Sequence, residues 1–152
     1  MKLKEVGFEL AKKLKEIGFD IPVRARYAEI EGRDVEFKEY RKKEPESFNS
    51  YKFQTEHDKS IEAVFTNAPT QALAQMWFRK KHNIEIEISL GGEIESTDSK
   101  YFFSIGMLHN IANKKGKTPL WYFIGEDLLY DTYEKALEAG LLKACEIVKN
   151  KH

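Results

Sequence analysis

The chain has 152 residues, of which 41% are hydrophobic, so its composition is that of a folded domain and excludes a disordered chain. It carries 25 basic and 25 acidic side chains. A net charge of zero excludes a general nucleic-acid coat, which would be basic, and an acidic mimic of DNA. The single cysteine, Cys145, cannot form an intramolecular disulfide, so we expect a reducing, cytoplasmic compartment. We also expect neither a signal peptide nor a membrane anchor, because no apolar window approaches the ~20 residues that span a bilayer.

The N-terminal part begins with apolar residues at helical spacing, which predict a helix over 2–17. Gly18 is a suitable stop for that helix, and Pro22 confirms its end. Alternating side chains then predict a strand near 23–27, and a hairpin turn is expected around 31–34.

Residues 41–66 have weaker signals. The run RKKEPE over 41–46 is charged and contains a proline, so we interpret it as a solvated loop. Apolar residues alternate with polar ones over 48–53, which indicates another strand, and a short apolar group follows at 61–65.

The next helix has clear boundary signals. Asn67 can cap a helix, and Pro69 fits a first turn. The cations at 79–82 favour the negative end of the helix dipole, which also accounts for His82, and Asn83 can supply a left-handed stop.

Three strands and a last helix are predicted after that stop. The strands are 84–90, 101–107 and 120–125; a glycine turn at 91–92 follows the first and a polar connection at 114–117 precedes the third. Asp131 and Glu134 have the spacing of a capping box for the last helix. Gly140 falls inside that helix, where it costs up to ~1 kcal/mol, so we expect a close contact with another backbone there.

These elements predict the fold class α+β, with an antiparallel sheet packed by helices. We expect one domain over 1–152, with an irregular part over 1–66 and a compact α-β-β-β-α unit over 67–152. Short loops between successive strands favour antiparallel pairing.

Candidate catalytic and metal-binding residues are few. His57 lies beside Glu56 and Asp58, and His109 follows the strand predicted to end near 107. Each could do acid–base chemistry or bind a metal, but a solvated stretch or a local hydrogen bond explains them better. We therefore assign no catalytic residue, no metal ligand and no cofactor.

Three other features have structural interpretations. Glu85 and Glu87 share one strand face, as a cation site would need, but this alternation is also typical of a half-buried strand. Trp77 and Cys145 lie on or beside the apolar stripes of their helices and are predicted to be buried.

Two basic clusters could bind nucleic acid, because aromatics interleaved with cations can stack on bases and hold phosphates. The candidate residues are Arg79, Lys80, Lys81, Lys114, Lys115 and Lys117.

Two stretches together resemble an uncharacterised family of small proteins encoded by bacteriophages and prophages: 68–88 (APTQALAQMWFRKKHNIEIEI) and 130–148 (YDTYEKALEAGLLKACEIV). In that family a PTQALAQKWLRE helix runs into an amphipathic strand, and an aromatic strand and a TYEEALEAGL helix follow. The resemblance covers about the last half of the chain. It implies a small accessory protein of a phage or integrated element, and it implies no reaction.

The order α-β-β-β-α is also that of double-stranded-RNA-binding domains. Those domains place lysines at the start of the final helix, facing phosphates. Here Asp131 and Glu134 stand at that place beside the single Lys135, and two carboxylates would repel a phosphate.

We therefore expect a non-enzymatic accessory protein that binds a host or phage protein, with its contact surface within 35–60. The alternative is a nucleic-acid-binding module that uses the two basic clusters. A third hypothesis is a binder of small ligands or nucleotides that uses His57, His109 or the Tyr- and Trp-rich sheet. The sequence leaves the partner and the oligomeric state open.

Overall fold

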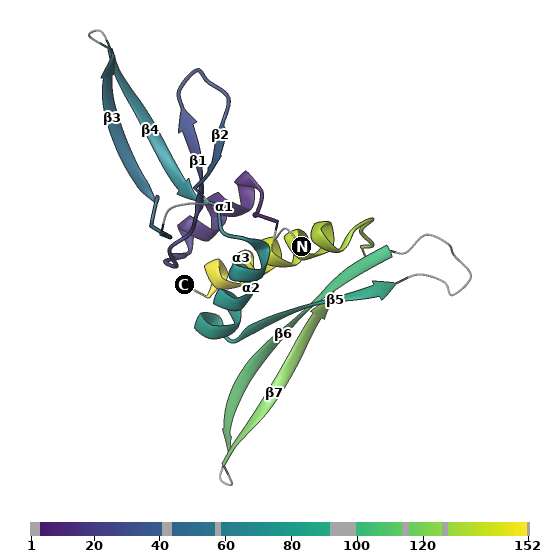
Figure 1. Ribbon diagram of the computed structural model, residues 1–152. Coiled ribbons are helices and arrows are strands. Elements are labelled where there is room, and N and C mark those ends of the chain that lie inside the picture. Colours follow the sequence, from purple (N-terminus) through teal and green to yellow (C-terminus); the bar gives the residue numbers. More distant parts are fainter. Residues whose placement is uncertain are drawn as a thin grey trace. The chain divides into compact units, whose positions relative to one another are not determined.

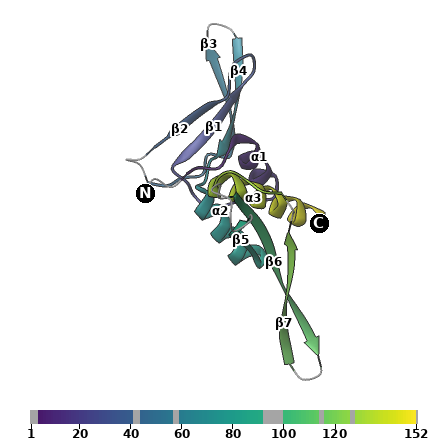
Figure 2. The same cartoon turned by 90° about the vertical axis from the view of Figure 1, so that its right-hand side faces the viewer.

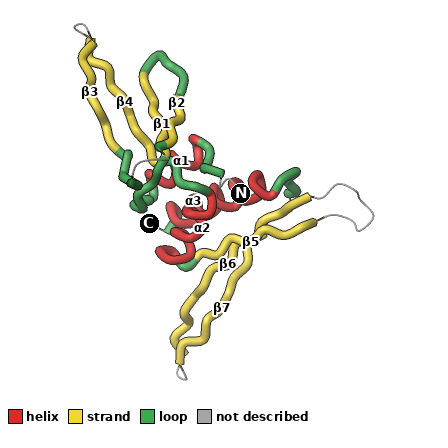
Figure 3. The backbone as a smooth tube through the Cα atoms, in the orientation of Figure 1, coloured by secondary structure: helices red, strands yellow, loops and turns green. Residues whose placement is uncertain are grey.

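The computed structural model describes residues 4–40, 44–56, 59–91, 100–113, 116–125 and 128–151. The chain divides into two compact units, Met1–Thr70 and Gln71–His152, here called the N-terminal and the C-terminal unit. Both contain helices and antiparallel strands, which confirms the α+β class (Figures 1 and 3). The division falls close to the predicted boundary at 66 and 67. That the units form a single domain stays a prediction.

The N-terminal unit holds a four-stranded sheet in the order β2-β1-β4-β3, with every pair antiparallel. The strands are β1 (Ala25–Ile30), β2 (Glu36–Glu39), β3 (Ser50–Glu56) and β4 (Lys59–Asn67). The hairpin predicted around 31–34 is present, and Gly32 in its turn has φ 76°. This region is thus more regular than we predicted. β4 escaped prediction because its sequence shows no simple apolar–polar alternation, since the successive residues Phe65, Thr66 and Asn67 at its end are all buried.

The first helix is shorter than the predicted 2–17, since α1 spans Phe8–Glu16. Val6 is fully buried in an extended segment, where its N–H donates to the Pro69 carbonyl at 2.9 Å. Val6 satisfies the same helical spacing as the later apolar residues, so the pattern alone could not separate the two conformations. Gly18 has φ 83° and ends the helix as predicted.

The C-terminal unit has the predicted order α-β-β-β-α. It contains α2 (Gln71–Trp77), the π-helix η1 (Phe78–His82), β5 (Ile84–Gly91), β6 (Lys100–Asn113), β7 (Gly116–Gly125) and α3 (Tyr133–Asn150). The three strands form an antiparallel sheet in the order β5-β6-β7. Asn83 adopts the predicted left-handed conformation, with φ 54° and ψ 38°, and its N–H donates to the carbonyl of Phe78.

Two predicted helix caps are wrong. Asn67 is the last residue of β4, where its Oδ1 accepts a hydrogen bond from the Phe48 N–H at 2.6 Å, and α2 begins four residues later. At α3 the N-cap is Thr132, whose side chain accepts from the Lys135 N–H at 3.2 Å, in place of Asp131. In both cases the polar side chain binds a residue distant along the chain: Phe48 for Asn67 and Lys100 for Asp131.

The core of the C-terminal unit lies between α3 and one face of the sheet. The buried residues on α3 are Ala136, Leu137, Gly140, Leu141, Ala144, Cys145 and Val148. They face Ile84, Ile86, Phe103 and Ile105 of β5 and β6, all of which are at most 1% exposed. The close contact expected at Gly140 is present, but its partners are the side chains of Ile86 and Phe103 and not a backbone.

The strand β6 is twice as long as predicted and continues past the start of β5. Ile84, the first residue of β5, pairs with Met107. Residues 108–113 of β6 then pair with residues 116–121 of β7 alone, as a two-stranded ribbon (Figures 1 and 2). Leu120 and Trp121 belong to β7 as predicted, whereas His109 lies in a strand and not in the predicted loop.

Candidate interaction surfaces

The basic residues of the first cluster lie on the π-helix η1. Arg79, Lys80 and Lys81 are exposed. The guanidinium of Arg79 forms a two-pronged ion pair with the Glu85 carboxylate, and this hydrogen bonding and charge raise the pKa of Arg79. The Lys81 Nζ lies 5.3 Å from the centre of the Trp77 ring. Part of the positive charge of this cluster is therefore used locally.

The second basic cluster cannot be placed beside the first. Lys114 and Lys115 lie outside the described residues. Lys117 belongs to β7, where it pairs with Ala112, and only its backbone is described. The prediction that the two clusters bind nucleic acid together stays a prediction.

The two histidine candidates fall outside the part of the chain whose side chains are described. His57 and Asp58 lie outside the described residues, and of His109 only the backbone is described. The described part of the chain brings together no group of three or more His, Cys, Asp and Glu side chains that could hold a metal ion. His82 packs its ring 4.7 Å from that of Trp77 at the end of η1.

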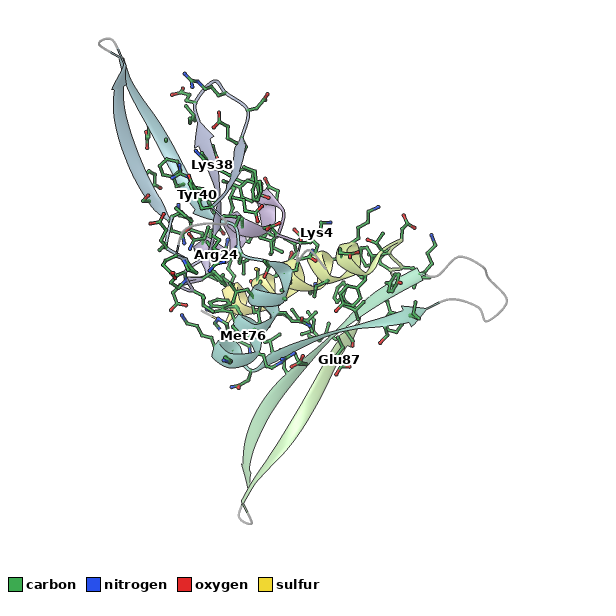
Figure 4. The ribbon with its side chains drawn as sticks, in the orientation of Figure 1. Lys4, Arg24, Lys38, Tyr40, Met76 and Glu87 are labelled. Carbon is green, nitrogen blue, oxygen red and sulfur yellow. The ribbon has the colours of Figure 1, made fainter. Side chains whose placement is uncertain are left out.

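The predicted structural residues are placed as expected. Trp77 and Cys145 are each 2% exposed, so both belong to the core. Glu85 is engaged by Arg79, and Glu87 stands exposed on β5 (Figure 4). The two carboxylates are thus a salt-bridge partner and a solvent-facing residue.

A group of exposed apolar side chains lies at one end of the β5–β6–β7 sheet and is here called the end cluster. Its members, with their exposed fractions, are Leu90 (67%), Leu128 (59%), Leu129 (51%) and Tyr133 (45%). Leu90 pairs across the sheet with Tyr101, whose backbone also forms a two-bond bridge with Tyr130. This isolated bridge holds the segment before α3 beside β6.

Leu90 and Tyr133 of the end cluster continue the core beyond the first turn of α3, whereas Leu129 lies with Phe102 on the opposite face of the sheet. Leu90 and Tyr101 share the sheet face that α3 covers farther along, where Ile86 and Phe103 are buried. The Tyr101 ring meets the Tyr133 ring edge-on at 6.3 Å. The same apolar face is therefore sealed by α3 at one end and exposed at the other.

Gly91 allows Leu129 to approach the end of β5. A Cβ atom at this position would lie 2.9 Å from Phe102 Cδ1 and 3.0 Å from Leu129 Cδ2. A side chain here would displace Leu129 from its position beside Phe102, on the sheet face opposite Leu90.

Ion pairs flank the end cluster. Lys100 Nζ lies 2.5 Å from one Asp131 oxygen, and Lys135 Nζ lies 3.8 Å from the other. The hydrogen bond and positive charge of Lys100, with a smaller contribution from Lys135, lower the pKa of Asp131. The apolar residues thus have a charged border.

In the N-terminal unit, Arg26 of β1 lies among aromatic rings. Its guanidinium carbon is 3.9 Å from the centre of the Phe65 ring, 5.4 Å from that of Tyr40 and 5.5 Å from that of Phe48. Tyr40 and Phe48 stack on each other at 5.2 Å, and Lys38 lies 5.5 Å from the Tyr40 ring (Figure 4). Sequence reasoning missed this group, whose members come from β1, β4 and the segments after β2 and before β3.

A second aromatic row lies on the other face of the same sheet. The Tyr27 ring is 5.3 Å from those of Phe8 and Phe37, and its hydroxyl donates to the Val6 carbonyl at 2.8 Å. Phe37 is 45% exposed, and Tyr51 on β3 is 65% exposed. These exposed rings fall within 35–60, the region where the sequence led us to expect a contact surface.

The chain has no match among protein-family models, curated proteins or solved structures. Among the described helices, none has the length and apolar character needed to cross a bilayer.

Proposed function

We propose that this chain is a non-enzymatic accessory protein, of the phage or prophage type, that acts by binding another protein. The observation that carries the proposal is the end cluster, where Leu90, Leu128 and Leu129 each expose more than half of their surface. Isolated exposed leucines are ordinary, but several exposed leucines at one end of a sheet are typical of an interaction site. The resemblance of residues 68–88 and 130–148 to phage-encoded proteins supports the genomic setting.

The composition of the end cluster favours a protein partner with an apolar contact segment. Leucine and tyrosine side chains form its centre, and the Lys100–Asp131 ion pair lies at its border. Protein interfaces commonly have this arrangement, in which an apolar core is surrounded by a polar rim. We expect the leucines, which the partner would bury, to contribute most of the binding energy and the ion pair to contribute little.

The test begins with a variant that carries a photo-crosslinking amino acid at position 128. A second variant that carries it at position 87 is the control. A partner that crosslinks at 128 and not at 87 is then purified. The variant L128S/L129S should weaken binding of that partner by at least tenfold, a loss of about 1.4 kcal/mol. F37S, which removes an exposed ring from the N-terminal unit, should leave it unchanged. Equal affinity of L128S/L129S and the wild type would contradict the proposal.

Nucleic-acid binding is the second candidate function, because residues 100–125 contain no Asp or Glu. The basic residues in this range are Lys100, Lys114, Lys115 and Lys117. The backbone of β6 and β7 forms a two-stranded ribbon, an element that some DNA-binding proteins insert into the major groove. Such binding would weaken steeply as salt rises.

Charge reversal tests the second candidate. The variant K80E/K81E/K114E/K115E should abolish salt-sensitive binding to short DNA and RNA duplexes. Unchanged binding by this variant, or no binding by the wild type at low salt, would contradict it.

A further inference from the structure

The open edge of β6 is determined by the direction of its backbone groups. In an antiparallel pair, directly opposite residues either exchange both hydrogen bonds or both point away from each other. The Ile86 carbonyl accepts from the Gln75 side chain at 2.6 Å, so Ile86 points away from β6. Its partner Ile105 must then point away from β5, toward β7.

The bridge between Tyr101 and Tyr130 gives the same alternation independently. Tyr101 donates to and accepts from Tyr130, at 2.8 and 2.7 Å, on the side of β6 opposite β5. Tyr101 and Ile105 are four residues apart and therefore point the same way. Odd-numbered residues of β6 thus face β7, and even-numbered residues face the side of β5.

Pro119 extends this assignment into the ribbon. It lies directly opposite Asn110 and has no N–H to donate, so this pair cannot exchange both hydrogen bonds. Asn110 therefore points away from β7, in agreement with its even number. The backbone N–H and C=O groups of Leu108, Asn110 and Ala112 consequently face the side of β5. β5 does not extend along these residues, because its first residue, Ile84, pairs with Met107.

The two edges of the ribbon differ in how well they could accept another strand. On β7, Pro119 removes one outward-facing donor and Lys117 adds a charge, two features that block strand addition. On β6, residues 108–113 read LHNIAN and contain no proline and no Asp, Glu, Lys or Arg. No strand of the described chain covers this edge.

We infer that residues 108–113 of β6 pair antiparallel with the same residues of a second copy of this chain. Two identical antiparallel strands are self-complementary about a two-fold axis, since each outward-facing residue supplies one donor and one acceptor. The uncharged sequence places no like charges opposite each other. The inference uses a different surface from the end cluster and does not depend on the proposed function.

The dimer forms through a short edge and is weak. Six residues extend about 20 Å along a strand. Such a contact buries less than the roughly 1,200 Å² of a standard stable interface. Association therefore depends on protein concentration and is measured near the highest concentration at which the protein stays in solution.

The decisive experiment compares two proline substitutions at one level of the ribbon. Ala112 and Lys117 are direct cross-strand partners. A112P removes an N–H from the open edge of β6, and K117P removes one from the blocked edge of β7. Neither substitution deletes a hydrogen bond between the two strands, so each variant controls for the cost of a proline in the other.

Sedimentation velocity over a concentration series measures the dimer, with near-ultraviolet circular dichroism as a check on folding. The wild type and K117P should dimerise alike, and A112P should lower the association constant by at least tenfold. A wild type that remains monomeric, or an equal effect of the two prolines, would overturn the inference.

Amide hydrogen exchange locates the contact without any substitution. The Asn110 and Ala112 amides should become protected as protein concentration rises, while those of Lys117 and Trp121 stay unchanged. Concentration-independent exchange at 110 and 112 in a dimeric sample would place the interface elsewhere and overturn the inference.

Discussion

Gly140 of α3 lies so close to Ile86 of β5 that a Cβ atom on the glycine would sit 2.8 Å from Ile86 Cγ2. The same atom would lie 3.2 Å from Cγ of Phe103. Real Cβ atoms do not approach other atoms this closely, so any side chain at position 140 forces α3 and the sheet apart. The close packing of α3 on the sheet therefore offsets the poor helix propensity of the glycine.

We predict that G140A destabilises the chain. Alanine gains up to ~1 kcal/mol of helix propensity, but overpacking a buried site typically costs about 1–3 kcal/mol, so the net loss is up to about 2 kcal/mol. Denaturant unfolding measures this difference. In an I86A background the clash is relieved, and G140A should then be neutral or stabilising. An equal penalty in both backgrounds would contradict the packing explanation.

The sequence predicts best where one local signal acts without competition. Ile84, Ile86 and Ile88 alternate with polar residues because β5 has one buried face, and Asn83 ends the preceding helix because few other residues tolerate its conformation. Val6 and Asn67 could not be predicted in this way. Each has a helical signal that a long-range partner overrides: the Pro69 carbonyl for Val6, and the Phe48 N–H for Asn67.

The candidate surfaces were harder to predict than the fold. For Leu128 and Leu129 the sequence allows either an extension of the sheet or a turn, and their exposure depends on where α3 begins. The aromatic environment of Arg26 combines residues that are distant along the chain and have no common motif. Such groups arise from the pairing of β1 with β4, and a single sequence does not encode that pairing locally.

Asn83 provides a second test, because it is the only residue other than glycine with positive φ among the described residues. N83A should lower the unfolding free energy by about 1–2 kcal/mol, since a residue with a Cβ atom but no polar side chain is disfavoured in the left-handed region. N83G should be neutral or slightly stabilising, because glycine adopts this conformation freely. Thermal unfolding of the two variants gives the comparison, and equal melting temperatures for them would contradict the prediction.

Arg26 tests the contribution of the aromatic rings in the N-terminal unit. R26K keeps the charge but loses the planar group that stacks on Phe65 at 3.9 Å. We expect R26K to lower the unfolding free energy by about 0.5–2 kcal/mol, the range of cation–π interactions between exposed and desolvated sites. F65L should remove most of that difference between arginine and lysine. A double-mutant cycle with no coupling between positions 26 and 65 would show that the stacking contributes nothing.

The environment of Lys15 should make the unfolding free energy depend on pH. Its Nζ donates to the Phe65 carbonyl at 2.9 Å and lies 5.4 Å from the Tyr51 ring. Burial lowers the pKa of Lys15, and the negative charge of Glu29 offsets part of this effect by raising it. The folded-state pKa is therefore below the unfolded value of about 10.4.

Between these two pKa values the unfolded chain binds more protons at Lys15 than the folded chain does. The contribution of Lys15 to the unfolding free energy must then rise with pH over this window and level off above about 10.4. K15M removes the group, so the wild-type minus K15M difference should increase across the window, while other lysines cancel. E29Q removes the opposing charge and should widen the window toward lower pH. A wild-type minus K15M difference that falls with rising pH, or a Lys15 pKa at or above that of a free lysine by NMR titration, would contradict the assignment of burial as the dominant cause.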